Sequence, residues 1–109
     1  MTALLVMTNM PDAESAQALA DALVGTHLAA CVSILSPCRS IYCWEGKREV
    51  AEEVPLLIKT TTARYAALEA AICARHPYEL PEIVAVPIAQ GLPAYLQWVD
   101  AETTEPPTC

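Results

Sequence analysis

The side chains best suited to bind a soft metal ion lie near the end of a predicted helix. His76 can ligate copper or zinc through an imidazole nitrogen, or exchange protons near neutral pH. Cys73 precedes it by three residues on the same helical face, a spacing compatible with a shared ion. The alternative is structural, because a histidine at a helix C-terminus suits the negative end of the helix dipole. The sequence leaves both interpretations of His76 open.

A further sulfur ligand, Cys31, lies in a predicted strand among alanine and valine residues. A free thiol in such a place either ligates a metal or fills a small apolar space.

The chain has five cysteines and no C-x-x-C pair. Its N-terminal residues have the pattern of a first strand and not of a secretion signal. Reduced thiols and a cytoplasmic location are therefore expected.

The composition argues against several classes of function. The net charge is −7 and the six lysine and arginine residues are scattered, which disfavours a nucleic-acid partner. No apolar run approaches the roughly 18 to 20 residues of a membrane-spanning helix, so no membrane partner is expected. Three glycines offer little material for a phosphate-binding loop, and no Ser/His/Asp arrangement is present. The sequence therefore does not predict an enzyme.

Apolar periodicity and turn residues predict a single domain over residues 1–109. The predicted elements are a strand at 1–7, a helix at about 11–25, a strand at about 28–42, a turn at 45–47, a strand running through Ile58, a helix ending at about His76, a strand at 83–88, a short helix from Pro93 and a flexible tail at 102–109.

Several residues are expected to shape these elements. Gly25 should end the first helix as a left-handed cap, and Pro55 should form a β-bulge. Thr61 or Thr62 should cap the second helix. An acidic patch in the hairpin should be solvated or meet a basic partner; it consists of Glu49, Glu52 and Glu53.

The element order is a split β-α-β unit repeated twice, the ferredoxin-like α+β arrangement. It predicts an antiparallel sheet with both long helices on one face, and makes the second and fourth strands the edges. The hairpin of the second and third strands is longer than a small domain needs, and 54% of the residues are apolar. An exposed apolar edge favours pairing with another chain, so a closed ring of subunits is expected. Tyr42 and Trp44, near the hairpin tip, are the predicted assembly residues.

Several sequence blocks resemble the CutA family of divalent-cation tolerance proteins. They occur in order over nearly the whole chain, at 28–32, 40–42, 44–47, 57–60, 76–83, 87–88 and 95–98. The resemblance implies a compact, non-catalytic homotrimer linked to tolerance of copper and other divalent metals. It implies weak binding of copper or another divalent cation, with no required cofactor. Met7 and Arg75 stand where some bacterial members carry a further cysteine and histidine, so a copper site built from those positions is altered or absent.

The same resemblance implies a second kind of site. Lys59, Tyr78, Glu82 and Trp44 match family positions and are expected to line a cleft between subunits, although Lys59 and Glu82 can equally form a structural ion pair. Three functions stay open. They are weak binding of divalent cations, a sensory trimer like the PII signalling proteins with a small anionic or neutral ligand in that cleft, and a scaffold without a small ligand.

Overall fold

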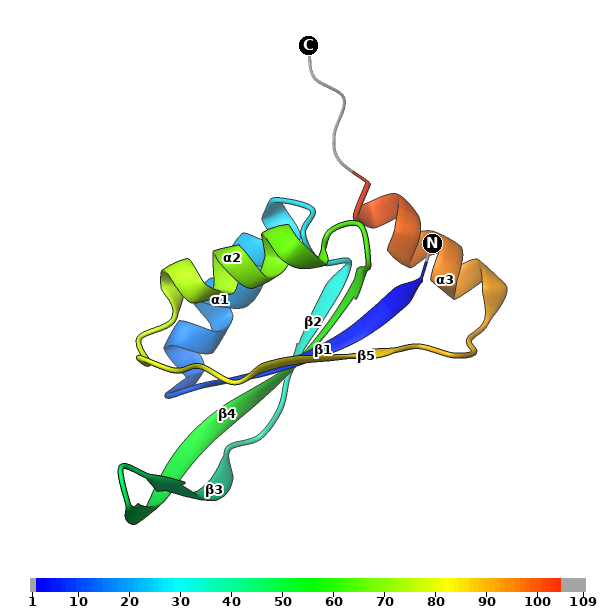
Figure 1. Cartoon of the computed structure of the whole chain (residues 1–109). Coiled ribbons are helices and arrows are strands. Elements are labelled where there is room, and N and C mark those ends of the chain that lie inside the picture. Colours follow the sequence, from blue (N-terminus) through cyan, green and yellow to red (C-terminus); the bar gives the residue numbers. More distant parts are fainter. Residues whose placement is uncertain (1, 105–109) are drawn as a thin grey trace.

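The computed structural model describes residues 2–104, which form one five-stranded sheet and three helices (Figure 1). The elements are β1 (Ala3–Met10), α1 (Ala13–Gly25), β2 (Cys31–Ile34), β3 (Cys38–Trp44), β4 (Lys47–Thr61), α2 (Tyr65–Arg75), β5 (Ile83–Pro87) and α3 (Pro93–Glu102). The α+β class is as predicted. None of the helices within residues 2–104 is long and apolar enough to cross a membrane.

The two ends of the chain differ from prediction or lie beyond the description. The first strand is longer than expected and reaches Met10 instead of ending at Met7. The predicted tail at 102–109 begins inside α3, whose last residue is Glu102. Residues 105–109 and residue 1 lie outside the described residues.

The sheet is antiparallel with the strand order β2-β4-β1-β5, and β3 pairs with the outer part of β4. Its edges are thus β2 and β5, as predicted for the second and fourth strands of the pattern. β4 is 15 residues long and pairs successively with β2 and β3, so the long hairpin is confirmed. Figure 1 shows this hairpin extending beyond the part of the sheet that the helices cover.

The predicted second strand is broken into β2 and β3. The bulge expected at Pro55 of β4 lies instead in the segment between β2 and β3, which faces Pro55. Ile34 pairs with Leu56 and Cys38 pairs with Glu53, so residues 35–37 face only two residues of β4. The extra residue therefore belongs to the partner strand. The Leu35 N–H donates to the Pro55 carbonyl over 2.9 Å, which points the nitrogen of Pro55 toward this same irregular stretch. The absence of an N–H on Pro55 therefore breaks no hydrogen bond of the β-ladder.

Helix ends follow local chemistry that differs from the prediction. Asp12 caps α1, since its carboxylate accepts from the Ser15 N–H over 2.7 Å, and this bond lowers the pKa of Asp12. Gly25 is the last helical residue of α1 and not its left-handed cap. The left-handed residue is His27, with φ of 60°, and the Leu28 N–H donates to the Leu23 carbonyl as in a Schellman motif.

The second helix also begins differently. Its N-cap is Arg64, and no side-chain hydrogen bond caps it. The prediction that Thr61 or Thr62 is the cap is therefore wrong. Thr61 is instead the last residue of β4 and is buried beside Thr103, the C-cap of α3, with their hydroxyl oxygens 3.5 Å apart.

The core lies between one face of the sheet and the helices α1 and α2. Alternate residues of the central strands point into it, as the two-residue repeat of a strand requires. The buried set is Leu4, Val6 and Met10 of β1, Val54, Leu56 and Ile58 of β4, Ala16, Leu19 and Leu23 of α1, and Leu68 and Ile72 of α2. Figure 1 shows α1 and α2 side by side over this face, and α3 packs elsewhere, on Ala3 and Ala30 through Val99.

Two buried threonines on the covered face provide a matched test of this packing. Thr60 donates its hydroxyl to the Leu28 carbonyl over 2.7 Å, whereas the Thr8 hydroxyl has no partner among the described residues. Because an unsatisfied buried hydroxyl is destabilising, Thr8→Val should raise the free energy of unfolding by about 1 kcal/mol. Thr60→Val should lower it by about 1 kcal/mol. Urea denaturation at one protein concentration measures both, and equal effects would contradict this difference in hydrogen bonding.

Candidate functional site

The β3–β4 hairpin turns through only two residues. Glu45 and Gly46 have φ of 50° and 79°, and two positive values are what a type I′ turn requires. The turn fixes the pairing register of the two strands. Because side chains alternate along a strand, this register places Tyr42, Trp44 and Glu53 on the same face of the hairpin.

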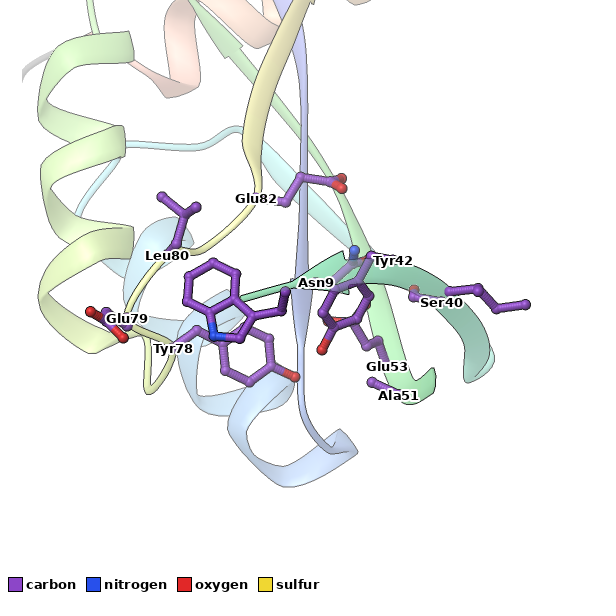
Figure 2. Close-up of a pocket in the computed structure, with 11 residues that line it drawn as sticks. Asn9, Ser40, Tyr42, Ala51, Glu53, Tyr78, Glu79, Leu80 and Glu82 are labelled. Atoms are coloured by element: carbon purple, nitrogen blue, oxygen red, sulfur yellow. The ribbon is translucent and has the colours of Figure 1, made fainter. Parts of the chain in front are cut away.

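A pocket of about 830 Å³ opens between this hairpin face and the segment that links α2 to β5. The hairpin contributes Tyr42, Trp44 and Glu53 to its lining, and the linking segment contributes Tyr78 and Glu82. Figure 2 shows Tyr42, Glu53 and Tyr78 converging from three different segments of the chain. The pocket therefore depends on the long hairpin curling toward the loop before β5.

The pocket is aromatic and acidic. Glu53 is only 7% exposed, so of the two alternatives for the acidic patch, solvation is wrong for this residue, and contact with a basic partner stays a prediction. Burial raises the pKa of Tyr78, and the neighbouring charge of Glu53 raises it further. None of the residues that line the pocket is a lysine or an arginine. The negative charge in this space thus has no basic counterpart in its walls.

His76 holds the linking segment against the sheet. Its Nε2 lies 2.7 Å from the carbonyl oxygen of Asn9, and the Tyr78 N–H points at its Nδ1 over 3.2 Å. Nδ1 is therefore an acceptor, so Nε2 carries the proton and donates to Asn9. The Asn9 carbonyl is available because β5 pairs with β1 only as far as Thr8. His76 thus attaches the chain to β1 beyond the end of β5.

These bonds favour the structural interpretation of His76 over the metal-ligating one. Its side chain is 9% exposed, and its ring lies 4.7 Å from the ring of Tyr78. A metal ion at either nitrogen would have to displace one of the two hydrogen bonds. The predicted pairing with Cys73 gains no support from an observed contact, and Cys73 itself is exposed.

Cys73 instead shares a helical face with a carboxylate. Glu69 precedes it by one turn of α2 and Tyr65 by two. The Tyr65 hydroxyl donates to Glu69 Oε2 over 2.8 Å. That hydrogen bond raises the pKa of Tyr65, with smaller contributions from burial and from the charges of Glu69 and Cys73. The thiol and the carboxylate are thus close neighbours on the surface.

Lys59 lies apart from the pocket, on the sheet face away from α1 and α2. Its Nζ is 3.8 Å from Cys31 Sγ and 6.0 Å from the centre of the Tyr95 ring. The Tyr95 hydroxyl oxygen is 3.6 Å from the same sulfur, and this contact raises the pKa of Tyr95. An ammonium group beside Cys31 opposes the approach of a metal cation to that sulfur.

The structural ion pair between Lys59 and Glu82 does not form within one chain. Lys59 lies opposite Leu5 of β1, whereas Glu82 precedes Ile83, which lies opposite Thr8. Three residues along β1 amount to roughly 10 Å. The two side chains also belong to segments on opposite sides of β1.

Comparison with known proteins identifies the family that shares this architecture. The family model described as CutA1 divalent ion tolerance protein matches residues 4–102. The chain belongs to the CutA1 family. A divalent-cation tolerance protein CutA from Pectobacterium atrosepticum is 42% identical over 99 residues, which cover 91% of this chain and 90% of that protein.

Solved CutA1 structures share the whole fold. The divalent cation tolerance protein from Thermus thermophilus is 44% identical with a TM-score of 0.91, covering 93% of this chain and 98% of that one. CutA1 from Oryza sativa is 36% identical with a TM-score of 0.93, covering 97% of both chains. The α+β sheet and three helices described above are thus those of CutA1 proteins.

In this CutA1 chain the structure brings together part of the predicted cleft. Trp44, Tyr78 and Glu82 line one pocket with Tyr42, but Lys59 does not line it. Sequence reasoning missed Glu53 as a lining residue. The alternation of side chains along the paired hairpin strands could have identified Glu53 as a lining residue, because Glu53 shares a face with Tyr42 and Trp44.

The predicted metal donors do not form a closed site within one CutA1 chain. Among residues 2–104, no group of three or more His, Cys, Asp or Glu side chains is arranged to hold a metal ion. His76 is engaged in two hydrogen bonds, and Cys31 faces an ammonium group. The residues present therefore do not fit a tightly held metal within a single chain, where a structural site usually needs four ligands.

Proposed function

We propose that this chain acts in divalent-cation tolerance, as a cytoplasmic, non-catalytic homotrimer of ferredoxin-like protomers. The observation that carries the proposal is the family match over residues 4–102, together with relatives named divalent-cation tolerance proteins at 42–44% identity. The cytoplasm suits the free thiols of the described cysteines, since reduced cysteines persist there.

Exposed apolar residues on the sheet face opposite α1 and α2, here called the open sheet face, support assembly with further copies of the chain, because α3 covers only the Ala3 end of that face. Cross-strand pairs place Leu57, Met7 and Val84 in one row, and Lys59, Leu5 and Val86 in the next. Val84 and Val86 are 46% and 44% exposed, although they lie on the sheet. Exposed apolar surface of this kind marks an interaction site. A trimer would bury this face and shield the edges of the sheet.

The hairpin offers a second apolar surface for the same assembly. Ile41 pairs with Val50, and these side chains are 64% and 49% exposed. Tyr42 and Trp44, which the sequence predicts as assembly residues, are 44% and 37% exposed and line the pocket. Their role in assembly remains part of the proposal.

Within this proposal, copper or another divalent cation is bound weakly. Among the described residues, Cys73 and Glu69 are an exposed thiol and an exposed carboxylate one helical turn apart, and Glu69 also accepts the Tyr65 hydrogen bond. A thiolate and one carboxylate make an incomplete coordination set, and soft thiolates favour Cu(I) and zinc. We expect dissociation constants above about 1 μM, which corresponds to less than about 8 kcal/mol of binding free energy.

Calorimetric titration of the reduced protein with zinc and Cu(I) tests this site. Cys73→Ser should weaken binding about tenfold or more, because the variant loses the only soft donor of the pair. The matched control is Cys43→Ser, which removes another exposed thiol and should leave binding unchanged. Identical titrations of the two variants, or no binding by the wild type, would overturn the assignment.

A sensory trimer is the second candidate, favoured by the pocket between the hairpin and the segment before β5. Its volume of about 830 Å³ suits a small molecule. Thermal-shift screening against metabolites separates this function from metal binding, since a ligand of the folded protein raises its melting temperature. If neither metals nor metabolites bind, the scaffold is the remaining candidate function.

A further inference from the structure

We propose that the pocket between the β3–β4 hairpin and the segment before β5 binds an organic cation, a small molecule that carries an ammonium or guanidinium group. The inference does not depend on the role in metal tolerance. It replaces the anionic or neutral ligand expected from the sequence, because Lys59, the only basic residue of the predicted cleft, does not line this pocket.

The charge in the pocket calls for a cation. The buried Glu53 lines the pocket beside Tyr42 and Tyr78, and the exposed Glu79 and Glu82, which also line it, lie apart from Glu53 (Figure 2). A buried carboxylate is costly unless an opposite charge or hydrogen bonds compensate it. None of the lining side chains is basic, and the residue paired with Glu53 across the hairpin is Cys38. The Tyr78 hydroxyl provides a hydrogen bond to Glu53, but no lining side chain provides an opposite charge, and a bound cation would supply it.

The walls of the pocket select an organic cation. Tyr42, Trp44 and Tyr78 contribute three aromatic rings, and aromatic faces attract ammonium and guanidinium groups within about 6 Å. Tyr78 is held in place by the bond from its N–H to His76 and by ring contact with that residue. One wall is thus fixed before any ligand arrives, which lowers the entropic cost of binding.

A bare metal ion fits this space less well. Among the described residues, the carboxylates do not form a group of three that could hold a metal. The volume of about 830 Å³ far exceeds what one coordinated ion requires and falls within the usual range for small-molecule pockets. The negative charge of the pocket is therefore spread over separate carboxylates between aromatic rings. This arrangement suits a cation larger than a metal ion.

Calorimetry on the full-length, assembled protein tests the proposal with two cationic probes, choline and agmatine. The neutral control is 3,3-dimethylbutanol, which has the shape of choline without its charge. At least one cation should bind, and the neutral isostere of choline should bind about tenfold or more weakly than choline if choline is the cation bound. Failure of both cations to bind would overturn the proposal, as would equal binding of choline and its isostere.

Two substitutions locate the binding. Glu53→Gln should weaken the bound cation about tenfold, and Trp44→Leu should weaken it by roughly threefold to thirtyfold. The control is Glu52→Gln, which makes the same charge change on the opposite face of the same strand, at an exposed position. Circular dichroism checks that each variant is folded, and light scattering that it keeps the mass of the wild type, since Trp44 is also a predicted assembly residue. Equal losses in Glu53→Gln and Glu52→Gln would show a nonspecific charge effect and contradict the assignment.

Zinc provides the remaining comparison. The proposal predicts that Glu53→Gln leaves zinc binding unchanged, because the carboxylates in the pocket do not converge on one ion among the described residues. Zinc binding lost in Glu53→Gln, without any binding of choline or agmatine, would identify the pocket as a metal site and overturn the proposal. Failure of the proposed metal site would instead appear as zinc binding that Cys73→Ser leaves unchanged. The two failures are therefore distinguishable.

Discussion

Val84→Lys is expected to dissociate the proposed trimer into single chains of 11.7 kDa. Val84 lies on the sheet face opposite α1 and α2, away from the Ala3 end of that face that α3 covers, and its neighbour across the strand is Met7. In a trimer that buries this face, each chain would carry an unpaired lysine into an apolar contact. The cost is on the order of 3–5 kcal/mol for each chain. Light scattering at micromolar concentration measures the resulting mass.

Val24→Lys is the matched control for this variant. Val24 lies on α1 and is 42% exposed, close to the 46% of Val84, but it is not on the open sheet face. Lysine is also a good residue for a helix, so the fold should tolerate the change. The control should keep the mass of the wild type. An unchanged mass for Val84→Lys would show that assembly does not use the open sheet face.

His76→Asn should lower the free energy of unfolding by about 3 kcal/mol. The variant loses the bonds of the ring to Asn9 and Tyr78 and leaves space where a buried imidazole packed. Chemical denaturation measures the change. The geometry predicts that metal affinity is unaffected under conditions where the variant is folded, because His76 acts through its hydrogen bonds.

The control is His27→Asn, at the other histidine of the chain. His27 has a positive φ, which asparagine tolerates, and its Nδ1 lies 3.0 Å from the Glu102 carbonyl oxygen at an exposed position. This change should cost less than about 1 kcal/mol. Similar losses for the two histidines, or loss of metal binding by folded His76→Asn, would contradict the structural role of His76.

Much of the fold could be predicted because its signals are local. Leu19 and Leu23 recur at helical spacing, and both are buried on α1. The alternation of strand and helix identified the edges, since few topologies fit that order. The break between β2 and β3 was harder to foresee. It depends on which of two paired strands takes the extra residue, and only the register across the sheet decides that.

The site was less predictable because it depends on long-range contacts. Three glutamates at 49, 52 and 53 look alike in the sequence, yet only Glu53 is buried: the register places Glu52 on the opposite face, and Glu49, on the same face as Glu53, lies nearer the exposed hairpin tip. Lys59 matches a family motif, but its position along β4 places it beside Cys31 and not in the pocket. His76 was the first candidate for metal binding. A carbonyl 67 residues earlier in the chain, that of Asn9, engages its ring instead.

The organic-cation pocket and the weak metal site are separate expectations with separate residues. Glu53 and Trp44 carry the first, and Cys73 with Glu69 carries the second. Variants at one site should therefore leave the other unchanged. This independence allows a sensory function and a tolerance function to be tested in the same protein preparation.

The central claim, a role in divalent-cation tolerance, is tested most directly by growth under copper challenge. The host is a bacterial strain that lacks its own CutA protein and regains copper tolerance when that protein is restored. The wild-type chain should restore tolerance, and Val84→Lys, expressed at the same level, should not. Growth of cells with the wild-type chain that is no better than growth with an empty vector would contradict the proposed function.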